Sequence, residues 1–219
     1  MVTRSTAAGA RAGLRTLLAL DVVLLAPRGG RLVVFAPDAR KGRRALPSGP
    51  PRAGEALDAA AQRVARAALG GPVAWLQQVS ARVDGGRTSV VYAGLVAEPP
   101  SDDERWIAHE RAGTLGTGPR QLVDTAVRST GVWLDRSPIA FKLLPATFTL
   151  SELQEVYEIL LGRVLHKASF RRALQSSKLV TPTREWRSEG RGRPAQLFRF
   201  APKARKASRR GVRFDWLTE

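Results

Sequence analysis

The order of structural signals in the last third of the chain constrains its fold most. Thr149-Leu-Ser-Glu152 has the spacing of a capping box, in which the threonine hydroxyl and the glutamate carboxylate each accept a backbone hydrogen bond. Apolar residues then recur at helical spacing up to Leu161, and Gly162 is typical of a helix end. A second helix is expected over 167–176, followed by strands in LVTPTREW and AQLFRF. This order predicts a winged helix-turn-helix domain over residues 137–202.

The second of these helices has a face rich in hydrogen-bond donors. Phe170 and Leu174 are expected to point inward, and the outward-facing residues are then Lys167, Ser169, Arg171, Arg172 and Gln175. A helix of this kind can enter a major groove and reach phosphates and base edges. The turn SEGRGRP adds Arg191 and Arg193 at the tip of the hairpin. We predict that all these residues contact DNA; a solvated basic face on an ordinary helical hairpin is the alternative.

The charge of the chain points to the same partner. It carries 36 basic and 19 acidic residues, a net charge of +17. From Ser137 onward there are 17 basic and 7 acidic residues, so the smaller C-terminal part holds +10 of this charge. Such an excess indicates an anionic partner, and we expect double-stranded DNA. A genome rich in G and C would also favour arginine, but it explains the shortage of acids less well.

The ends of the chain carry weaker signals. Residues 1–14 are small and polar and are expected to be disordered. The tail over 203–219 has six basic residues and no acid between Lys203 and Arg213. This tail is either a flexible arm that binds phosphates or only a solubilising terminus, and the sequence leaves both possibilities open.

The part of the chain before Ser137 alternates between strand and helix patterns. The strands are expected over residues 16–25, 32–35, 73–83, 88–96 and 105–108, and the helices over residues 55–69 and 121–134. Asp84-Gly85-Gly86 is a hairpin signal between the third and fourth strands. This alternation predicts a layered α/β domain over residues 15–136. With the winged helix that follows, the fold class is α+β.

Composition excludes several classes of protein. No apolar run approaches the roughly 18 to 20 residues of a membrane span. The basic start followed by an apolar stretch could suggest a signal peptide, but Asp21 interrupts it and no small-residue cleavage site follows. We therefore expect a cytoplasmic protein. The absence of cysteine excludes disulfides and thiolate zinc sites, and only His109 and His166 offer imidazole.

The C-terminal motifs closely resemble those of one known family. LLPATFTLSELQEVYEILLGRVLHKASFRRALQSSKLV, followed by GRGRPAQLFRF, resembles the winged helix of the Nudix-related transcriptional regulators. FTLSELQ-VYE, LGR, K--FRR and GRPA-L-RF occur in the family's order over about residues 138–201. The resemblance implies an N-terminal Nudix-like α/β/α sandwich that senses a nucleotide-derived effector, typically ADP-ribose. It also implies a homodimer that binds operator DNA and, in many members, represses genes of NAD metabolism.

The chain keeps the spacing of the Nudix box but lacks most of its metal-binding acids. The pattern G-x5-E-x7-R-E-U-x-E-E-x-G places its invariant positions on Gly49, Glu55, Arg63 and Gly70. Its remaining three glutamates fall on Val64, Ala67 and Ala68. Magnesium in Nudix hydrolases needs oxygen ligands, which valine and alanine cannot supply. We therefore expect no metal cofactor and no catalytic residue. We interpret Glu55 as an acid favoured at a helix N-terminus and Arg63 as part of a salt bridge.

Loss of the metal ligands does not fill the ligand pocket. Arginines could neutralise a diphosphate directly, and the candidates are Arg43, Arg44, Arg82 and Arg87. Each could instead be an ordinary surface residue, and the domain could serve only for dimerisation. Two further functions stay open: a Nudix-type nucleotide-diphosphate hydrolase, and a non-specific architectural DNA-binding protein. The latter is suggested by the basic tail and by Arg-Gly-Arg-Pro at 191–194, which resembles an AT-hook.

Overall fold

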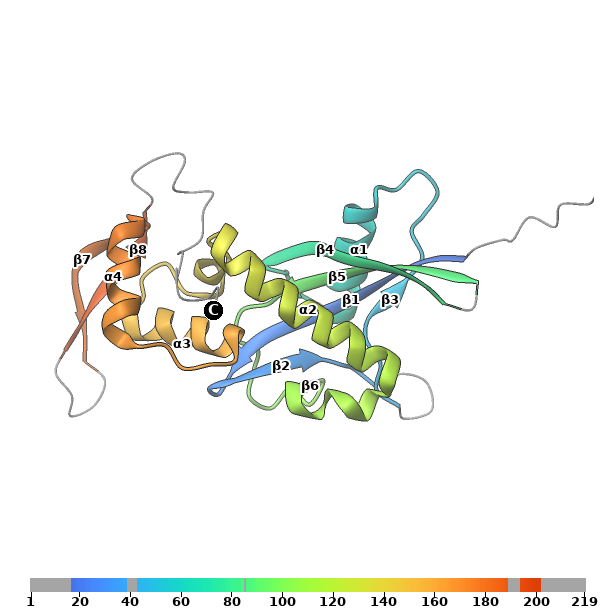
Figure 1. Cartoon of the computed structure of the whole chain (residues 1–219), viewed down its shortest axis with the longest axis horizontal. Coiled ribbons are helices and arrows are strands. Elements are labelled where there is room, and N and C mark those ends of the chain that lie inside the picture. The colour runs from blue at the N-terminus through green and yellow to red at the C-terminus, as the bar shows by residue number, and fades with distance from the viewer. Residues whose placement is uncertain (1–16, 39–42, 85, 189–193, 202–219) are drawn as a thin grey trace, which may run out of the picture.

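A computed structural model describes residues 17–38, 43–84, 86–188 and 194–201. The molecule is elongated, with a layered sheet domain at one end and the winged helix at the other (Figure 1). The expectations for residues 1–14, for the tail over 203–219 and for Arg191 and Arg193 lie outside the described residues.

The N-terminal domain is built on one mixed sheet. Its strand order is β4 (Trp75–Asp84), β5 (Arg87–Leu95), β1 (Leu17–Arg28), β2 (Arg31–Phe35) and β6 (Trp106–Ala108), with β3 (Ser48–Gly49) pairing to β1. Strand β1 pairs in parallel with β5 and antiparallel with β2 and β3. Central strands are buried on both faces, which explains the nearly unbroken apolar run of β1. The predicted hairpin β4–β5 is confirmed, with Asp84 opposite Arg87.

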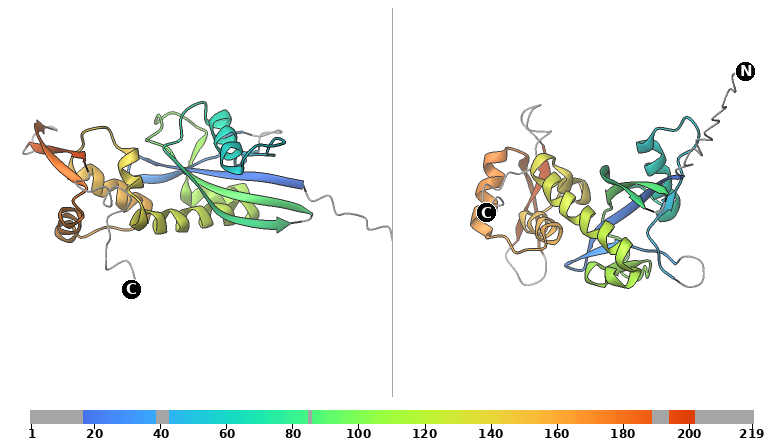
Figure 2. Two further views of the ribbon diagram at one scale, coloured as in Figure 1. Left: turned by 90° about the horizontal axis from the view of Figure 1, so that it is seen from above. Right: turned by 45° about the vertical axis from the view of Figure 1, so that its right-hand side comes forward.

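Two helices cover opposite faces of this sheet (Figure 2). Helix α1 (Leu57–Leu69) packs against one face, where Val22 and Leu24 of β1 share a core with Ala61. Helix α2 (Thr117–Arg136) packs against the other, where Val23 shares a core with Val123. Alternate residues of the strand therefore face different helices, as the pleat requires. The predicted α/β/α sandwich is confirmed.

Some boundaries differ from the prediction. Helix α1 begins at Leu57, not at residue 55, because the Glu55 carboxylate accepts a hydrogen bond from the Arg52 amide and so closes the preceding turn. Helix α2 begins at Thr117, four residues before the predicted start. A 3-10 helix, η2 (His109–Leu115), connects β6 to α2 and has no counterpart in the sequence prediction.

The winged helix follows the predicted order of elements. It contains the 3-10 helix η3 (Ile139–Leu143), the helices α3 (Leu150–Leu161) and α4 (Lys167–Ser177), and the strands β7 (Val180–Arg187) and β8 (Ala195–Phe200). The capping box is confirmed: Thr149 Oγ1 accepts from the Glu152 amide at 3.1 Å, and Glu152 Oε2 accepts from the Thr149 amide at 2.6 Å. Gly162 ends α3 in the left-handed conformation at φ 65°.

The two domains share one apolar core. Buried side chains continue from the α2 face of the sheet through Leu134, Ile139 and Phe141 into α3 and α4. Helix α3 also packs directly on α2, β1 and β2. A displacement within the sheet domain can therefore reach the winged helix through packed side chains. Among the described helices, none is long and apolar enough to cross a membrane.

Candidate nucleic-acid interface and ligand cleft

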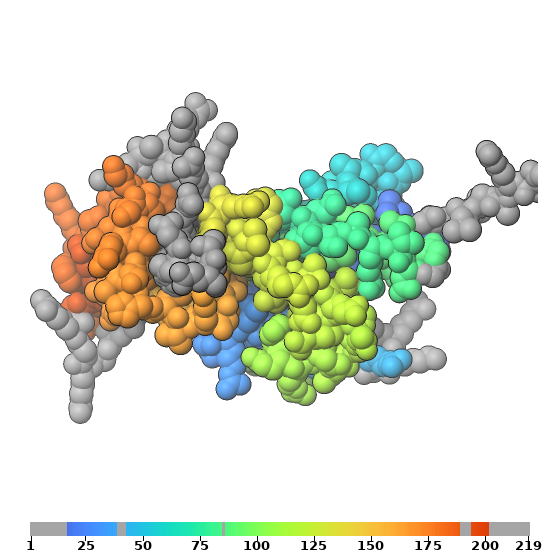
Figure 3. Space-filling view, in the orientation of Figure 1, coloured from blue at the N-terminus to red at the C-terminus, as the bar shows by residue number. Residues whose placement is uncertain are grey.

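Helix α4 is fixed by its apolar face and presents its basic face to solvent. Phe170 and Leu174 are almost fully buried, and the Phe170 ring packs edge-on against Tyr157 of α3 at 5.6 Å between centroids. The predicted inward direction of these two side chains is confirmed. The exposed residues of α4 include Lys167, Arg171, Arg172 and Gln175. The helix contains no acidic residue, and it lies at the surface of the winged-helix end of the molecule (Figure 3).

Ser169 differs from the other predicted contact residues of α4. It is half-buried, and its hydroxyl lies 3.2 Å from Nδ1 of His166. His166 is the N-cap residue of α4 and is exposed, but the sequence pattern did not single it out. Ser169 and His166 thus flank the N-terminal end of the helix, where a DNA phosphate could approach both the side chains and the backbone amides.

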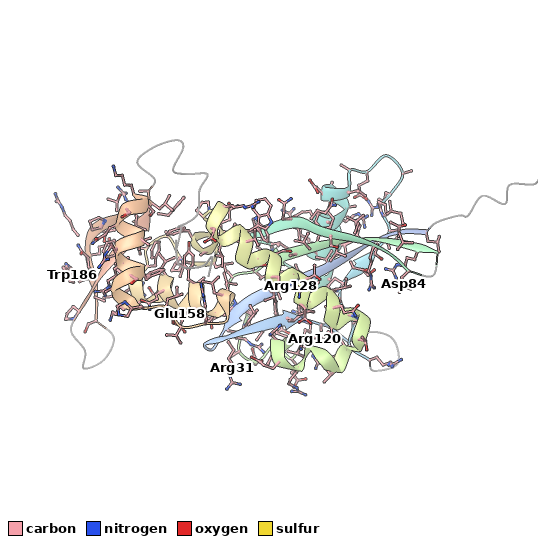
Figure 4. All side chains as sticks on the ribbon, in the orientation of Figure 1. Arg31, Asp84, Arg120, Arg128, Glu158 and Trp186 are labelled. Atoms are coloured by element: carbon pink, nitrogen blue, oxygen red, sulfur yellow. The ribbon has the colours of Figure 1, made fainter. Side chains whose placement is uncertain are left out.

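The hairpin β7–β8 carries an exposed aromatic side chain. Trp186 is 60% exposed and lies on the outer side of the wing (Figure 4). Beside it, Arg187 Nη1 contacts Glu152 Oε1 at 2.6 Å and ties the wing to the start of α3. A tryptophan in a strand pattern is usually read as core, so sequence reasoning did not include Trp186 among the DNA contacts. An exposed tryptophan on a rigid hairpin can pack against a nucleic-acid groove.

Two of the three residues at the positions of the missing Nudix acids pack against the core of the sheet domain. Val64 is buried between α1 and the sheet, where a Cβ on Gly49 would lie only 3.1 Å from Val64 Cγ2. Ala67 is exposed, and Ala68 packs partly against the same core. Within the described residues, no group of three or more histidine, aspartate or glutamate side chains is placed to hold a metal ion. These residues do not fit the magnesium centre of a Nudix hydrolase.

Glu55 is also committed to a structural role. Its carboxylate accepts from Arg63 Nε at 2.8 Å, from Arg63 Nη2 at 2.7 Å and from the Arg52 amide at 2.8 Å. These hydrogen bonds, first of all those from Arg63, lower the pKa of Glu55 to about 2. The predicted salt bridge of Arg63 is therefore confirmed, and it holds the loop that precedes α1.

The four arginines predicted to bind a ligand do not lie together. Arg87 Nη2 donates to Asp21 Oδ1 and to Ser48 Oγ, each at 2.9 Å, and so joins β5 to β1 and β3. Arg82 reaches from β4 toward the start of α2, near Gly118. Neither of these arginines lines the cleft in which Arg43 and Arg44 are found.

That cleft has a volume of about 1530 Å³ and lies between β2, β6, η2 and the start of α2. Its lining includes the arginines Arg28, Arg31, Arg43, Arg44 and Arg111, together with Trp106 and Leu115. Arg28 is held by the carbonyls of Pro100, Asp103 and Trp106, and Arg44 donates to the Glu104 carbonyl.

Within the described part of the chain, the side chains of Arg31, Arg43 and Arg111 make no hydrogen bond. They line a concave surface to which Leu115 and Pro119 add apolar area, and such an arrangement suits an anionic ligand. The sequence prediction included Arg43 but not Arg31 or Arg111, which are 80 residues apart in the chain and line the same cleft because β2 pairs with β6.

Comparisons with known proteins agree with both parts of the fold. Residues 140–200 match the family model of the NrtR DNA-binding winged helix domain. The ADPR responsive transcriptional repressor NtrR of Acinetobacter baylyi is 36% identical over 103 residues. That match covers 46% of this chain but only 41% of the relative's length.

Solved structures extend the similarity to most of the chain. NrtR of Shewanella oneidensis complexed with a 27mer DNA superposes with a TM-score of 0.75 at 26% identity, covering 90% of this chain and 99% of that one. A second crystal structure of the same protein gives a TM-score of 0.72 at 24% identity. The resemblance to the Nudix-related regulators is confirmed, and residues 140–200 form a winged helix of the NrtR type.

Proposed function

We propose that this chain, whose C-terminal domain is an NrtR-type winged helix on the two-domain fold of NrtR, is a transcriptional repressor that binds operator DNA and responds to ADP-ribose or a related nucleotide. The observation that carries the proposal is the match of residues 140–200 to a DNA-binding domain whose exposed helix bears donors and no acid. A relative named as ADPR responsive and a structural neighbour solved with DNA support the two ligands. Such a repressor acts in the cytoplasm, where its operator is.

DNA recognition is assigned to α4 and the wing. Lys167, Arg171, Arg172 and Gln175 reach base edges and phosphates, while Ser169 and the arginines predicted at the wing tip, Arg191 and Arg193, add contacts at the margins. We propose a homodimer, because two copies of α4 related by a twofold axis would read two halves of a partly palindromic operator. The net charge of +17 predicts binding that weakens steeply as salt rises.

A pair of charge-matched double variants tests this assignment. Arg171→Ala/Arg172→Ala should lower specific operator affinity by tenfold or more, since a lost bidentate base contact costs about 1–3 kcal/mol. Arg52→Ala/Arg66→Ala removes the same charge from exposed positions around α1 and should leave the specific affinity almost unchanged. Equal losses in both double variants would show that bulk charge, not α4, determines binding.

The effector site is assigned to the arginine cleft. Arg31, Arg43 and Arg111 have no hydrogen-bond partner among the described residues, so their guanidinium groups can bind the two phosphates without a metal ion. Calorimetry with ADP-ribose distinguishes the cleft arginines from the other arginines that the sequence predicted as ligand contacts. Arg43→Gln should weaken binding about tenfold, whereas Arg82→Gln should not, because Arg82 lies outside the cleft. Weakening by Arg82→Gln alone would place the ligand elsewhere.

We also propose that the Nudix-like domain binds without hydrolysis. Val64, Ala67 and Ala68 provide no oxygen ligand, and the oxygens of Glu55 are occupied by Arg63 and Arg52. Incubation of the protein with ADP-ribose and Mg²⁺ should release no AMP above the rate without protein. Turnover that scales with protein concentration would favour the hydrolase alternative.

A further inference from the structure

A second cavity lies beside the arginine cleft, at the junction between the two domains. This junction pocket has a volume of about 510 Å³. One wall is formed by Gly30, Arg31 and Leu32 at the start of β2, by His109 and Glu110 of η2, and by Val127 of α2. The opposite wall is formed by the end of α3 and the segment after it, from Glu155 to Val164. The β1–β2 hairpin and η2 thus separate two cavities, one facing the proposed effector and the other facing the winged helix.

Arg31 is the only described residue that lines both cavities. It is the first residue of β2 and follows Gly29 and Gly30, which both adopt positive φ. Its side chain is exposed at the lower edge of the sheet in Figure 4 and makes no hydrogen bond to the described residues. A guanidinium group without a fixed partner can move between the two cavities at little cost.

The charges on the two sides of Arg31 are opposite. The described lining of the cleft also contains Arg28, Arg43, Arg44 and Arg111, and its one acid is Glu104. The described lining of the junction pocket contains Glu110, Glu155 and Glu158, together with Arg163 and His109. Without a ligand, Coulomb forces favour the pocket side for Arg31. A diphosphate in the cleft would reverse this preference.

The far wall of the junction pocket is hydrogen-bonded to the segment that precedes α4. Glu158 Oε1 accepts from the Leu165 amide at 2.8 Å and from Gln154 Nε2 at 2.9 Å. Gln154 Nε2 also donates to the Leu165 carbonyl at 3.0 Å. Leu165 is buried and lies two residues before Lys167, the first residue of α4. A change in the charge beside Glu158 therefore acts on the segment that anchors the DNA-binding helix.

We propose that Arg31 is a positioning residue that couples the arginine cleft to α4: in the ligand-free protein it stays unpaired between the two cavities, within the field of the junction-pocket acids, and an anionic ligand in the cleft draws it away from them. The inference rests on the proposed effector function and adds the route of the signal. A ligand shifts such an equilibrium only by its difference in affinity for the two states, and Arg31 supplies that difference.

The test measures operator Kd with and without saturating ADP-ribose, and ADP-ribose Kd separately by calorimetry. In the wild-type protein the ligand should change operator Kd by about fivefold or more, in the range typical of allosteric coupling. In Arg31→Gln this change should fall below twofold at saturating ligand. The matched control Arg43→Gln removes a cleft arginine that does not line the pocket; it should bind ADP-ribose more weakly but keep the full change at saturation.

Two further variants make the proposal independent of ligand affinity. Glu155→Gln removes an acid from the pocket wall and should shift the operator Kd of the ligand-free protein in the direction that ADP-ribose shifts the wild type. Arg31→Lys keeps the charge and should restore part of the coupling. The proposal is overturned if Arg31→Gln binds ADP-ribose and retains the wild-type change in operator Kd. Failure of the wild-type protein to bind ADP-ribose would overturn the proposed effector function as well, and calorimetry separates these two results.

Discussion

Arg63 forms a bidentate pair with Glu55: its Nε and Nη2 atoms lie 2.8 and 2.7 Å from the two carboxylate oxygens. The pair joins the middle of α1 to the turn before it and therefore preserves the loop–helix shape of a Nudix box. The catalytic acids of that box are replaced on the same helix by Val64, Ala67 and Ala68. The helix keeps the spacing and shape of the box, but these three positions provide no carboxylate.

Acid should weaken the fold through Glu55. Its pKa is about 2 in the folded chain against 4.5 for an unperturbed glutamate, so the unfolded state takes up its proton first as the pH falls. The stabilisation is complete above about pH 4.5 and is lost as the pH approaches 2. Urea unfolding between pH 6 and pH 2.5 should show a smaller loss of stability for Glu55→Gln than for the wild type. The exposed Asp102→Asn serves as control and should follow the wild-type curve; identical curves for Glu55→Gln would contradict the assignment.

Restoring the Nudix acids one at a time should have unequal costs. Val64→Glu places a carboxylate in the core between α1 and the sheet and should lower the free energy of unfolding by about 2–4 kcal/mol. Ala67→Glu adds the same group at an exposed position and should change it by less than about 0.5 kcal/mol. Chemical denaturation measures both. Comparable costs would mean that Val64 is not a core residue.

Arg87 should prove to be a residue of the fold and not of the ligand site. Its guanidinium group pairs with Asp21, whose carboxylate is only 9% exposed. Arg87→Ala leaves that carboxylate without its partner and should destabilise the chain by about 1–3 kcal/mol. ADP-ribose affinity, measured by calorimetry at a temperature where the variant is folded, should be unchanged. A normal unfolding curve with reduced ligand affinity would reverse this assignment.

Trp186 should contribute to DNA binding without contributing to stability. Because 60% of the side chain is exposed, Trp186→Ala should change the free energy of unfolding by less than about 0.5 kcal/mol. Operator affinity should fall on the order of tenfold, as expected when an exposed aromatic anchor is truncated. Val132→Ala truncates another exposed apolar side chain, on α2, and should leave operator binding as it is. Equal affinities for Trp186→Ala and the wild type would exclude this residue from the interface.

The sequence predicted the winged helix most accurately because its signals are local. The Thr149–Glu152 capping box, the glycine at 162 and the apolar spacing each act within a few residues, so α3 and α4 lie within about two residues of their predicted bounds. The same helical period explains why Phe170 points into the core while the basic residues around it point to solvent. Local rules were sufficient here.

The arginine cleft could not be predicted in this way because it is formed by pairing between strands that are distant in sequence. Arg31 and Arg111 come together only through the pairing of Val33 with Ala108, and η2 has no apolar period that would mark it as a helix. Arg87 was predicted as a ligand residue because its ion pair with Asp21 could not be recognised from the sequence, where the two residues are far apart. An acidic partner on another strand can be identified only when the pairing of the strands is known.

Titration of a labelled promoter fragment at near-physiological salt, with and without ADP-ribose, tests ligand-responsive repression most directly. The wild-type protein should bind the operator at least about 1000-fold more tightly than a scrambled duplex of equal length. ADP-ribose should change the operator affinity by about fivefold or more and leave the scrambled duplex unaffected. Equal affinities for both duplexes, with no response to ADP-ribose, would contradict the assignment of this chain as an effector-controlled repressor.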